Sequence, residues 1–231
     1  MGEDKKCSEL PQEVAAIRRE IGKFFDTLDD KGRKVGSSTH GVYAFFDYDS
    51  EPIYVGQTYE RLRGRIGRHL TNQRTDAVAM NVLDPFEVAE IEVWPLDDQI
   101  AALSKDVMPK DFLNQAEYTV FQRVLANSTL GAVLNEKELI PTDIIELPPS
   151  YRQRIVPDAV FELRKHPDIR IARRANTIAN LARVISERSV SDGLRKTLLT
   201  QARRLELLAS QRLGELEIED PAPRRIPGEN G

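Results

Sequence analysis

Two short runs of aromatic and β-branched residues constrain the fold most, because they interrupt a pattern that is otherwise helical. The runs are GVYAFFDY (41–48) and IYVG (53–56), and the turn-rich sequence DSEP lies between them. Runs of this kind joined by a short Asp/Ser/Pro loop are typical of a β-hairpin. Helical spacing of apolar residues follows from residue 59 to about residue 73. The sequence therefore predicts a hairpin that leads directly into a helix.

The segments on either side of this unit also alternate between helix and strand. Apolar residues at helical spacing predict an amphipathic helix over 11–30, and the alternating pattern of FEVAEIEVW (86–94) predicts a third strand. Residues 109–126 predict another helix, since Pro109 and Asp111 are favourable at a helix start. The predicted order over the middle of the chain is hairpin, helix, strand, helix.

A proline pair divides the chain. Consecutive prolines at 148 and 149 resist both helix and sheet pairing, and beyond them 169–188 and 191–218 predict an antiparallel helical hairpin. We therefore expect an N-terminal helix and linker, a central domain, a basic helical region and a disordered tail, over 1–37, 38–145, 146–218 and 219–231.

The charge is distributed unevenly along the chain. Residues 1–150 carry 17 basic and 26 acidic side chains, whereas residues 151–212 carry 14 basic and 6 acidic ones. A basic segment joined to an acidic one either binds a polyanion or folds back onto its own acidic partner. Charge alone leaves both interpretations open.

Composition excludes several classes of protein. No apolar run approaches the roughly 18 residues that span a bilayer, and MGEDKKCSEL lacks the apolar stretch of a signal peptide. The single cysteine, Cys7, excludes an intramolecular disulfide and a cysteine-cluster zinc site. With 30% charged residues, we expect a soluble, cytoplasmic protein with no membrane partner.

Two tyrosines of the predicted hairpin are candidate functional residues. Tyr43 and Tyr54 lie on adjacent strands, where both side chains are able to share one face of the sheet and bring their hydroxyls together. Strand tyrosines are more often packing residues with a hydrated hydroxyl. The pair by itself supports either interpretation.

The helix predicted after the hairpin is strongly basic. Arg65 and His69 are four residues apart and flank its apolar stripe, so both lie at the boundary between core and solvent. A guanidinium at such a position offers a fork that matches phosphate oxygens. A solvated basic face is the alternative.

Glu117 stands out in the later helix because its neighbours at helical spacing are apolar. These neighbours are Leu113, Val120, Phe121 and Val124. A carboxylate among apolar residues is costly unless it is paired or binds a cation. Glu117 is therefore a candidate ligand for magnesium, or else the partner of a nearby arginine.

Taken together, these features resemble the GIY-YIG nuclease superfamily over roughly residues 38–140. The resemblance rests on Gly41-Val42-Tyr43, Tyr54-Val55-Gly56, the spacing of Arg65 and His69, Glu117 on a later helix and Asn135 beyond it. The fold that it implies is α+β, with a small three-stranded antiparallel sheet flanked by helices. The predicted order of elements is consistent with that fold.

The resemblance also implies a role for each matching residue. Tyr43 would act in general-base catalysis, Tyr54 would support it near the phosphate, and Arg65 would stabilise the charged transition state. His69 would assist proton transfer or positioning, Glu117 would bind one divalent ion (Mg²⁺ or Mn²⁺), and Asn135 would orient the site. The implied activity is a metal-dependent endonuclease that hydrolyses DNA phosphodiester bonds, of a restriction type or a stand-alone repair or defence type.

The arginines outside this set suggest how DNA would be held. We expect contacts with DNA from two positions on the basic helix and four on the helical hairpin, namely Arg61, Arg68, Arg173, Arg174, Arg203 and Arg204. Alternatively, the hairpin buries its leucines against a second copy of the chain or another protein. The chain would then be a DNA-binding or partner-dependent accessory protein of the same fold.

Overall fold

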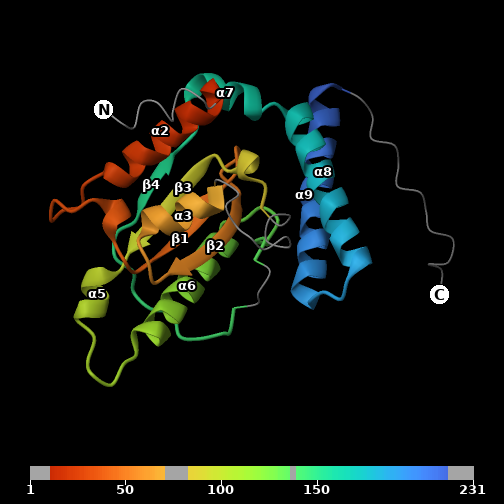
Figure 1. The fold of residues 1–231 in the computed structure, drawn as a ribbon. Helices are drawn as coiled ribbons and strands as arrows, with labels where there is room; N and C mark the ends of the chain where they lie inside the picture. The colour runs from red at the N-terminus through yellow and green to blue at the C-terminus, as the bar shows by residue number, and fades with distance from the viewer. Residues whose placement is uncertain (1–10, 71–82, 136–138, 218–231) are drawn as a thin grey trace.

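A four-stranded antiparallel sheet lies at the centre of the computed structural model, which describes residues 11–70, 83–135 and 139–217 (Figure 1). The strands are β1 (Gly41–Phe46), β2 (Pro52–Thr58), β3 (Glu90–Pro95) and β4 (Tyr151–Arg154), in the spatial order β2-β1-β3-β4. All six residues of β1 are buried, because this strand is paired on both sides. The sheet therefore holds β1 rigidly and leaves β2 at an edge.

The predicted hairpin is present as β1 and β2. Tyr43 is opposite Gly56 and Phe45 is opposite Tyr54, with an irregularity between Phe45 and Phe46. Ser50 adopts a φ of 57° in the connecting turn, a left-handed conformation that short polar side chains tolerate better than bulky ones. The turn residues that predicted the hairpin thus also close it.

Helices cover both faces of the sheet. Because side chains alternate along a strand, Val42, Ala44 and Phe46 of β1 pack on one face against helix α6 (Pro109–Ala126). Tyr43 and Phe45 point to the other face, where helices α2 (Gln12–Asp26) and α3 (Leu62–Leu70) supply Phe24, Phe25, Leu62 and Ile66. The shorter helices are η1 (Val35–Ser37), η2 (Pro85–Glu87), α5 (Asp97–Ala101) and α7 (Asp158–Arg164).

Two long helices complete the fold. Helices α8 (Pro167–Glu187) and α9 (Asp192–Glu215) run side by side, beside the sheet rather than over it (Figure 1). The predicted α+β class, with an N-terminal helix and a C-terminal helical hairpin, is confirmed. Among the described residues, no helix is long and apolar enough to cross a membrane.

The expectation of three strands is wrong by one, because β4 pairs with β3. Strand β4 has the sequence YRQR: Tyr151 packs against the core, Arg152 pairs with Glu90 and Glu92 across the strands, and Arg154 pairs with Asp158. Arg152 donates to Glu90 at 2.7 Å, and its guanidinium lies 3.8 Å from the ring centroid of Phe46. A strand with a single apolar side chain leaves no hydrophobic pattern to read, so the sequence predicts its segment as part of the helical region 146–218.

Two further differences concern the boundaries of elements. The predicted strand 86–94 begins only at Glu90, because Asp84 accepts a hydrogen bond from the Phe86 amide at 3.0 Å and Pro85 begins a 3₁₀ turn. The predicted helix 59–73 is α3, and residues 71–73 lie outside the described residues. Cys7 and the tail 219–231 also lie outside them.

Buried arginines join the helical hairpin to the sheet. Asp47, at the end of β1, accepts hydrogen bonds from Arg170, Arg174 and Arg204 at 3.1, 2.9 and 2.5 Å. Arg174 also donates to Glu87 at 2.9 Å. All five side chains are buried. These three arginines therefore support the second interpretation of the charge asymmetry, in which the basic segment folds back onto its own acidic partner.

This cluster corrects part of the expected nucleic-acid contact. Arg174 is 5% exposed and Arg204 is 2% exposed, so neither guanidinium is available to a phosphate backbone. The prediction assumed that the arginine side chains of the basic segment face solvent. The helical periodicity of this segment in fact places these two side chains on the face that meets Asp47 at the end of β1.

Replacing Asp47 with Asn tests this cluster. The substitution leaves three buried guanidinium groups with too little negative charge, and we expect a loss of about 3–5 kcal/mol in the free energy of unfolding. Urea unfolding followed by circular dichroism measures this loss.

Asp49→Asn is the matched control, because Asp49 also binds Arg170 but its side chain is 59% exposed. A partly solvated pair contributes about 1 kcal/mol or less. Equal losses in the two variants would contradict a special role for Asp47.

Candidate active site

The Tyr43 hydroxyl lies between two side chains of α3. Its oxygen is 3.0 Å from Nε2 of His69 and accepts a hydrogen bond from Nε of Arg65 at 3.3 Å. Arg65 and His69 are four residues apart, so both lie on the side of α3 that faces the sheet. The structure thus brings together three of the residues that the sequence singled out.

Gly56 makes room for this arrangement. It is opposite Tyr43 in the β1–β2 pair, and a Cβ atom there would lie 2.6 Å from the Tyr43 hydroxyl oxygen and 2.9 Å from Cε1 of Tyr54. Both distances are far shorter than van der Waals contact. The glycine of the Tyr54-Val55-Gly56 run is therefore required for the phenol to lie across β2.

Tyr54 extends the cluster on the same face of the sheet. Its ring centroid is 6.1 Å from that of Tyr43 and 5.4 Å from that of His69, and its ring is stacked on Phe45 at 6.0 Å. Tyr54 is half-buried, whereas Tyr43 is fully buried. Of the two tyrosines, Tyr54 is thus the one that reaches the surface.

Asn135 acts on the backbone of β2. Its side-chain amide donates to the Val55 carbonyl at 2.8 Å and accepts from the Val55 amide at 3.1 Å. The neighbouring Leu134 amide donates to the Ile53 carbonyl at 2.8 Å. An edge strand has unpaired backbone groups that need partners. Asn135 therefore fixes the outer edge of the strand that carries Tyr54 and Gly56.

Glu117 approaches the site from the opposite face, on α6. It is half-buried, and burial raises its pKa to about 7, while the charge of Arg65 and hydrogen bonds from the side chain and backbone of Gln57 act in the opposite direction. Gln57 belongs to the edge strand β2 and also donates to Asn114 at 2.8 Å. Gln57 was missed from the sequence, although its position directly after Gly56 places it on the face of β2 that meets α6.

The chemistry of Glu117 fits a single hard cation. Among the residues that the structure describes, no group of three or more His, Cys, Asp or Glu side chains is arranged to hold a metal ion. A divalent ion such as Mg²⁺ is often bound by one or two carboxylates, with water and phosphate oxygens in its other positions. A half-buried carboxylate with a raised pKa gains from such an ion. Glu117 therefore fits one ligand position of such an ion.

Burial, and not only the nearby cations, affects the pKa of the Tyr43 hydroxyl. Burial raises the pKa of its hydroxyl above the ordinary value, the charges of Tyr54 and Glu117 raise it further, and Arg65 lowers it. Burial has the largest effect. In the free protein the phenol is therefore protonated at neutral pH, and its hydrogen bond to His69 gives its proton a route away.

The other arginines expected to contact nucleic acid lie in different surroundings. Arg61 is exposed just before α3, and Arg68 forms an ion pair with Glu60. In the hairpin, Arg203 is exposed on α9, and Arg173 is 44% exposed and paired with Asp84. All four are thus accessible at least in part, unlike Arg174 and Arg204.

Comparison with protein families identifies this arrangement. Residues 39–121 match the model of the GIY-YIG catalytic domain, a range that includes Tyr43, Tyr54, Arg65, His69 and Glu117 but not Asn135. No curated protein and no solved structure gives a match. The resemblance inferred from the motifs is confirmed over these residues: they form a GIY-YIG catalytic domain. Such a domain has a nuclease-type function and acts on nucleic acid, and nucleases of this kind typically use a divalent metal.

Gly56→Ala tests the close approach of Tyr43 to β2. The added methyl group forces the phenol away from His69 and Arg65, so we expect nuclease activity to fall more than tenfold and stability to fall by about 1–3 kcal/mol. Plasmid cleavage and thermal unfolding measure the two effects.

The control is Gly22→Ala, at a position on α2 where a Cβ meets nothing within 4 Å. It should leave activity unchanged and stabilise the helix by about 0.5–1 kcal/mol. Full activity in Gly56→Ala would show that the close approach is not required.

The raised pKa of Glu117 predicts how stability depends on pH in EDTA. Since its folded-state pKa is about 7 against an ordinary 4.5, the folded protein binds the proton more tightly, and wild-type stability falls as pH rises through this window. Glu117→Gln lacks this effect, so its stability relative to wild type should increase by at most about 3 kcal/mol between pH 4.5 and pH 7. Urea unfolding at several pH values measures the difference.

Glu60→Gln provides a control of opposite sign, because the side-chain hydrogen bond from Arg68 lowers the pKa of this exposed carboxylate. A difference between wild type and Glu117→Gln that does not change with pH would contradict the assignment.

Proposed function

We propose that this protein is a metal-dependent endonuclease that hydrolyses DNA phosphodiester bonds. The observation that carries the proposal is the Tyr43 hydroxyl, held between His69 and Arg65 over Gly56, with Glu117 reaching the same strand from the other face. A proton acceptor, a guanidinium and a candidate cation ligand at one strand are the groups that phosphodiester hydrolysis needs.

Tyr43 transfers a proton in the proposed reaction. As the oxygen of a water molecule forms a bond to phosphorus, the water loses a proton to the Tyr43 oxygen, and the phenol passes its own proton to Nε2 of His69. This route needs His69 to be neutral, with a lone pair on Nε2. It avoids forming a free phenolate in a buried position, which the raised pKa of Tyr43 makes costly.

Arg65 has two roles in this scheme. In the free protein its Nε donates to the Tyr43 hydroxyl at 3.3 Å, and the phenol is fully buried. A bound phosphate attracts the guanidinium, whose fork matches two phosphate oxygens. Its movement toward the phosphate uncovers the hydroxyl for water and places positive charge where negative charge develops as the P–O bond breaks.

Glu117 is the residue that would hold a divalent cation. When bound, such a cation would supply positive charge that offsets the negative charge of the phosphate. Asn135 takes no part in proton transfer, because both ends of its amide are occupied by Val55. It keeps β2 in place, so that Tyr54 and Gly56 retain their positions.

The alternative of an accessory protein that acts through its helical hairpin has less support. Three arginines of the hairpin bind Asp47, and Leu181, Val184 and Leu194 belong to the same hydrophobic core as Tyr43. The hairpin is therefore largely engaged by its own chain. Association with a second copy or another protein would have to use its outer face, where Leu199 is 53% exposed.

Plasmid cleavage by the purified protein tests the proposed activity. We expect nicked or linear DNA with Mg²⁺ or Mn²⁺ and none with EDTA, and Tyr43→Phe and Glu117→Ala should each reduce cleavage by at least about 100-fold. Discrete products would favour a restriction-type enzyme over a repair or defence nuclease of broader specificity.

Tyr118→Phe is the matched control, since Tyr118 is adjacent to Glu117 on α6 but does not belong to the aromatic cluster around Tyr43. It should retain full activity, and thermal unfolding should show that all three variants are folded. Wild-type turnover by both Tyr43→Phe and Glu117→Ala would contradict the proposed mechanism.

A further inference from the structure

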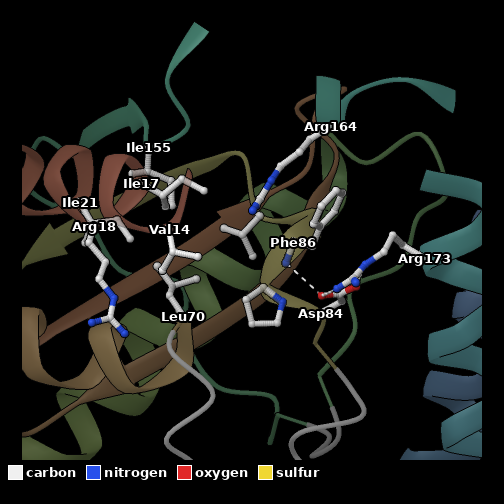
Figure 2. A pocket seen from close by; sticks show the side chains of 12 residues that line it. Val14, Ile17, Arg18, Ile21, Leu70, Asp84, Phe86, Ile155, Arg164 and Arg173 are labelled. Carbon is white, nitrogen blue, oxygen red and sulfur yellow. Dashed lines mark hydrogen bonds and ion pairs between the residues drawn. The ribbon is translucent and has the colours of Figure 1, made fainter. Parts of the chain in front are cut away.

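A cavity of about 280 Å³ lies beside α3, the helix that carries Arg65 and His69 (Figure 2). Its apolar wall comes from Val14, Ile17 and Ile21 of α2, from Leu70 at the end of α3 and from Ile155 after β4. The opposite side is formed by Asp84 and Phe86 next to η2. The cavity is thus bounded by the N-terminal helix, the catalytic domain and the segment that follows β4.

Guanidinium groups surround this cavity. Arg164 of α7 and Arg173 of α8 lie over the Phe86 ring, at 4.2 and 4.6 Å from its centroid, and Arg18 extends from α2 on the other side (Figure 2). Asp84 is the one acidic residue among the described lining residues. Asp84 pairs with Arg173, and Glu13, which lies outside the lining, pairs with Arg164. Three guanidinium groups against two carboxylates leave the rim with net positive charge around an apolar interior.

The position of the cavity relates it to the proposed reaction. Leu70, which lines it, directly follows His69, whose Nε2 lies 3.0 Å from the Tyr43 hydroxyl. Adjacent Cα atoms are about 3.8 Å apart. The cavity and the Tyr43–His69 pair therefore meet the same end of α3.

We propose that this cavity binds one unpaired nucleotide of the nucleic-acid strand that is cut, near the end of α3 that carries His69; this inference rests on the proposed nuclease function. The base lies against the apolar wall and the planar guanidinium groups, and its phosphate contacts the arginine rim. Unpaired bases are commonly bound by stacking on aromatic side chains and on arginine planes, combined with backbone contacts.

The combination of groups favours a nucleotide over a paired backbone. A surface that contacts only duplex phosphates needs exposed cations and no apolar interior. Here one cavity has both an apolar wall and a rim of arginines, and its volume accommodates a single base. Arg173, expected from sequence to contact nucleic acid, thereby receives a specific role that the buried Arg174 does not share.

Fluorescence anisotropy with two probes tests this inference on the full-length protein in EDTA. The probes are a labelled single-stranded oligothymidylate of fifteen nucleotides and a blunt duplex of the same length. We expect the double variant Arg18→Ala/Arg173→Ala to bind oligothymidylate about tenfold more weakly and the duplex less than threefold more weakly. Equal losses for both probes would overturn the proposal, because they would indicate general electrostatic attraction only.

The matched control is Arg19→Ala/Arg203→Ala, which removes the same charge from exposed positions on α2 and α9 that do not line the cavity. This control variant should bind both probes more weakly by the same small factor. If it lowers oligothymidylate affinity as much as the cavity variant does, the proposal fails.

A variant that fills the cavity without changing charge provides a second test. Ile17→Trp should reduce oligothymidylate binding about tenfold while duplex binding stays within threefold, with folding checked by circular dichroism. Unchanged oligothymidylate binding by folded Ile17→Trp overturns the proposal. Plasmid cleavage by the wild type is scored separately, so a failed nuclease assay and a failed cavity test are distinguishable.

Discussion

The Tyr43 hydroxyl lies over the backbone of Gly56, and the site is assembled only because that position has no side chain. The central strand β1 is paired on both edges, so Tyr43 cannot move away from its neighbours. Helix α3 is packed on the same face through Leu62 and Ile66, which brings Arg65 and His69 to the hydroxyl. One close approach between two strands thus sets the geometry of the cluster formed by Tyr43, Arg65 and His69.

A second constraint acts at the end of the same strand. Asp47 neutralises three buried arginines and ties the C-terminal hairpin to the catalytic half of the chain. A buried carboxylate with several charged donors is stable only while every partner stays in place. The helical hairpin is therefore part of the folded core of the protein, and its basic side chains serve the interior as well as the surface. Arg173, which directly precedes Arg174 on α8, faces outward and borders the cavity beside α3.

Much of the fold and the site was predictable because the informative residues are close in sequence. The hairpin, α6 and the two long C-terminal helices follow from periodicity and turn residues, and Tyr43, Tyr54, Arg65 and His69 follow from short spacings. Strand β4 was not predictable, since its pairing depends on charged partners in β3. The burial of Arg174 and Arg204 was not predictable either, because helical periodicity does not reveal which face meets a distant carboxylate.

Local spacing and side-chain chemistry are enough to define the class of fold, the catalytic domain and the residue types at its centre. Tertiary packing sets the raised pKa values of Tyr43 and Glu117, because burial is the largest cause of both shifts. It also decided that Asn135 pairs with the edge of β2, and that arginines from three helices surround one cavity. Contacts between residues far apart in the chain depend on packing, which no local pattern encodes.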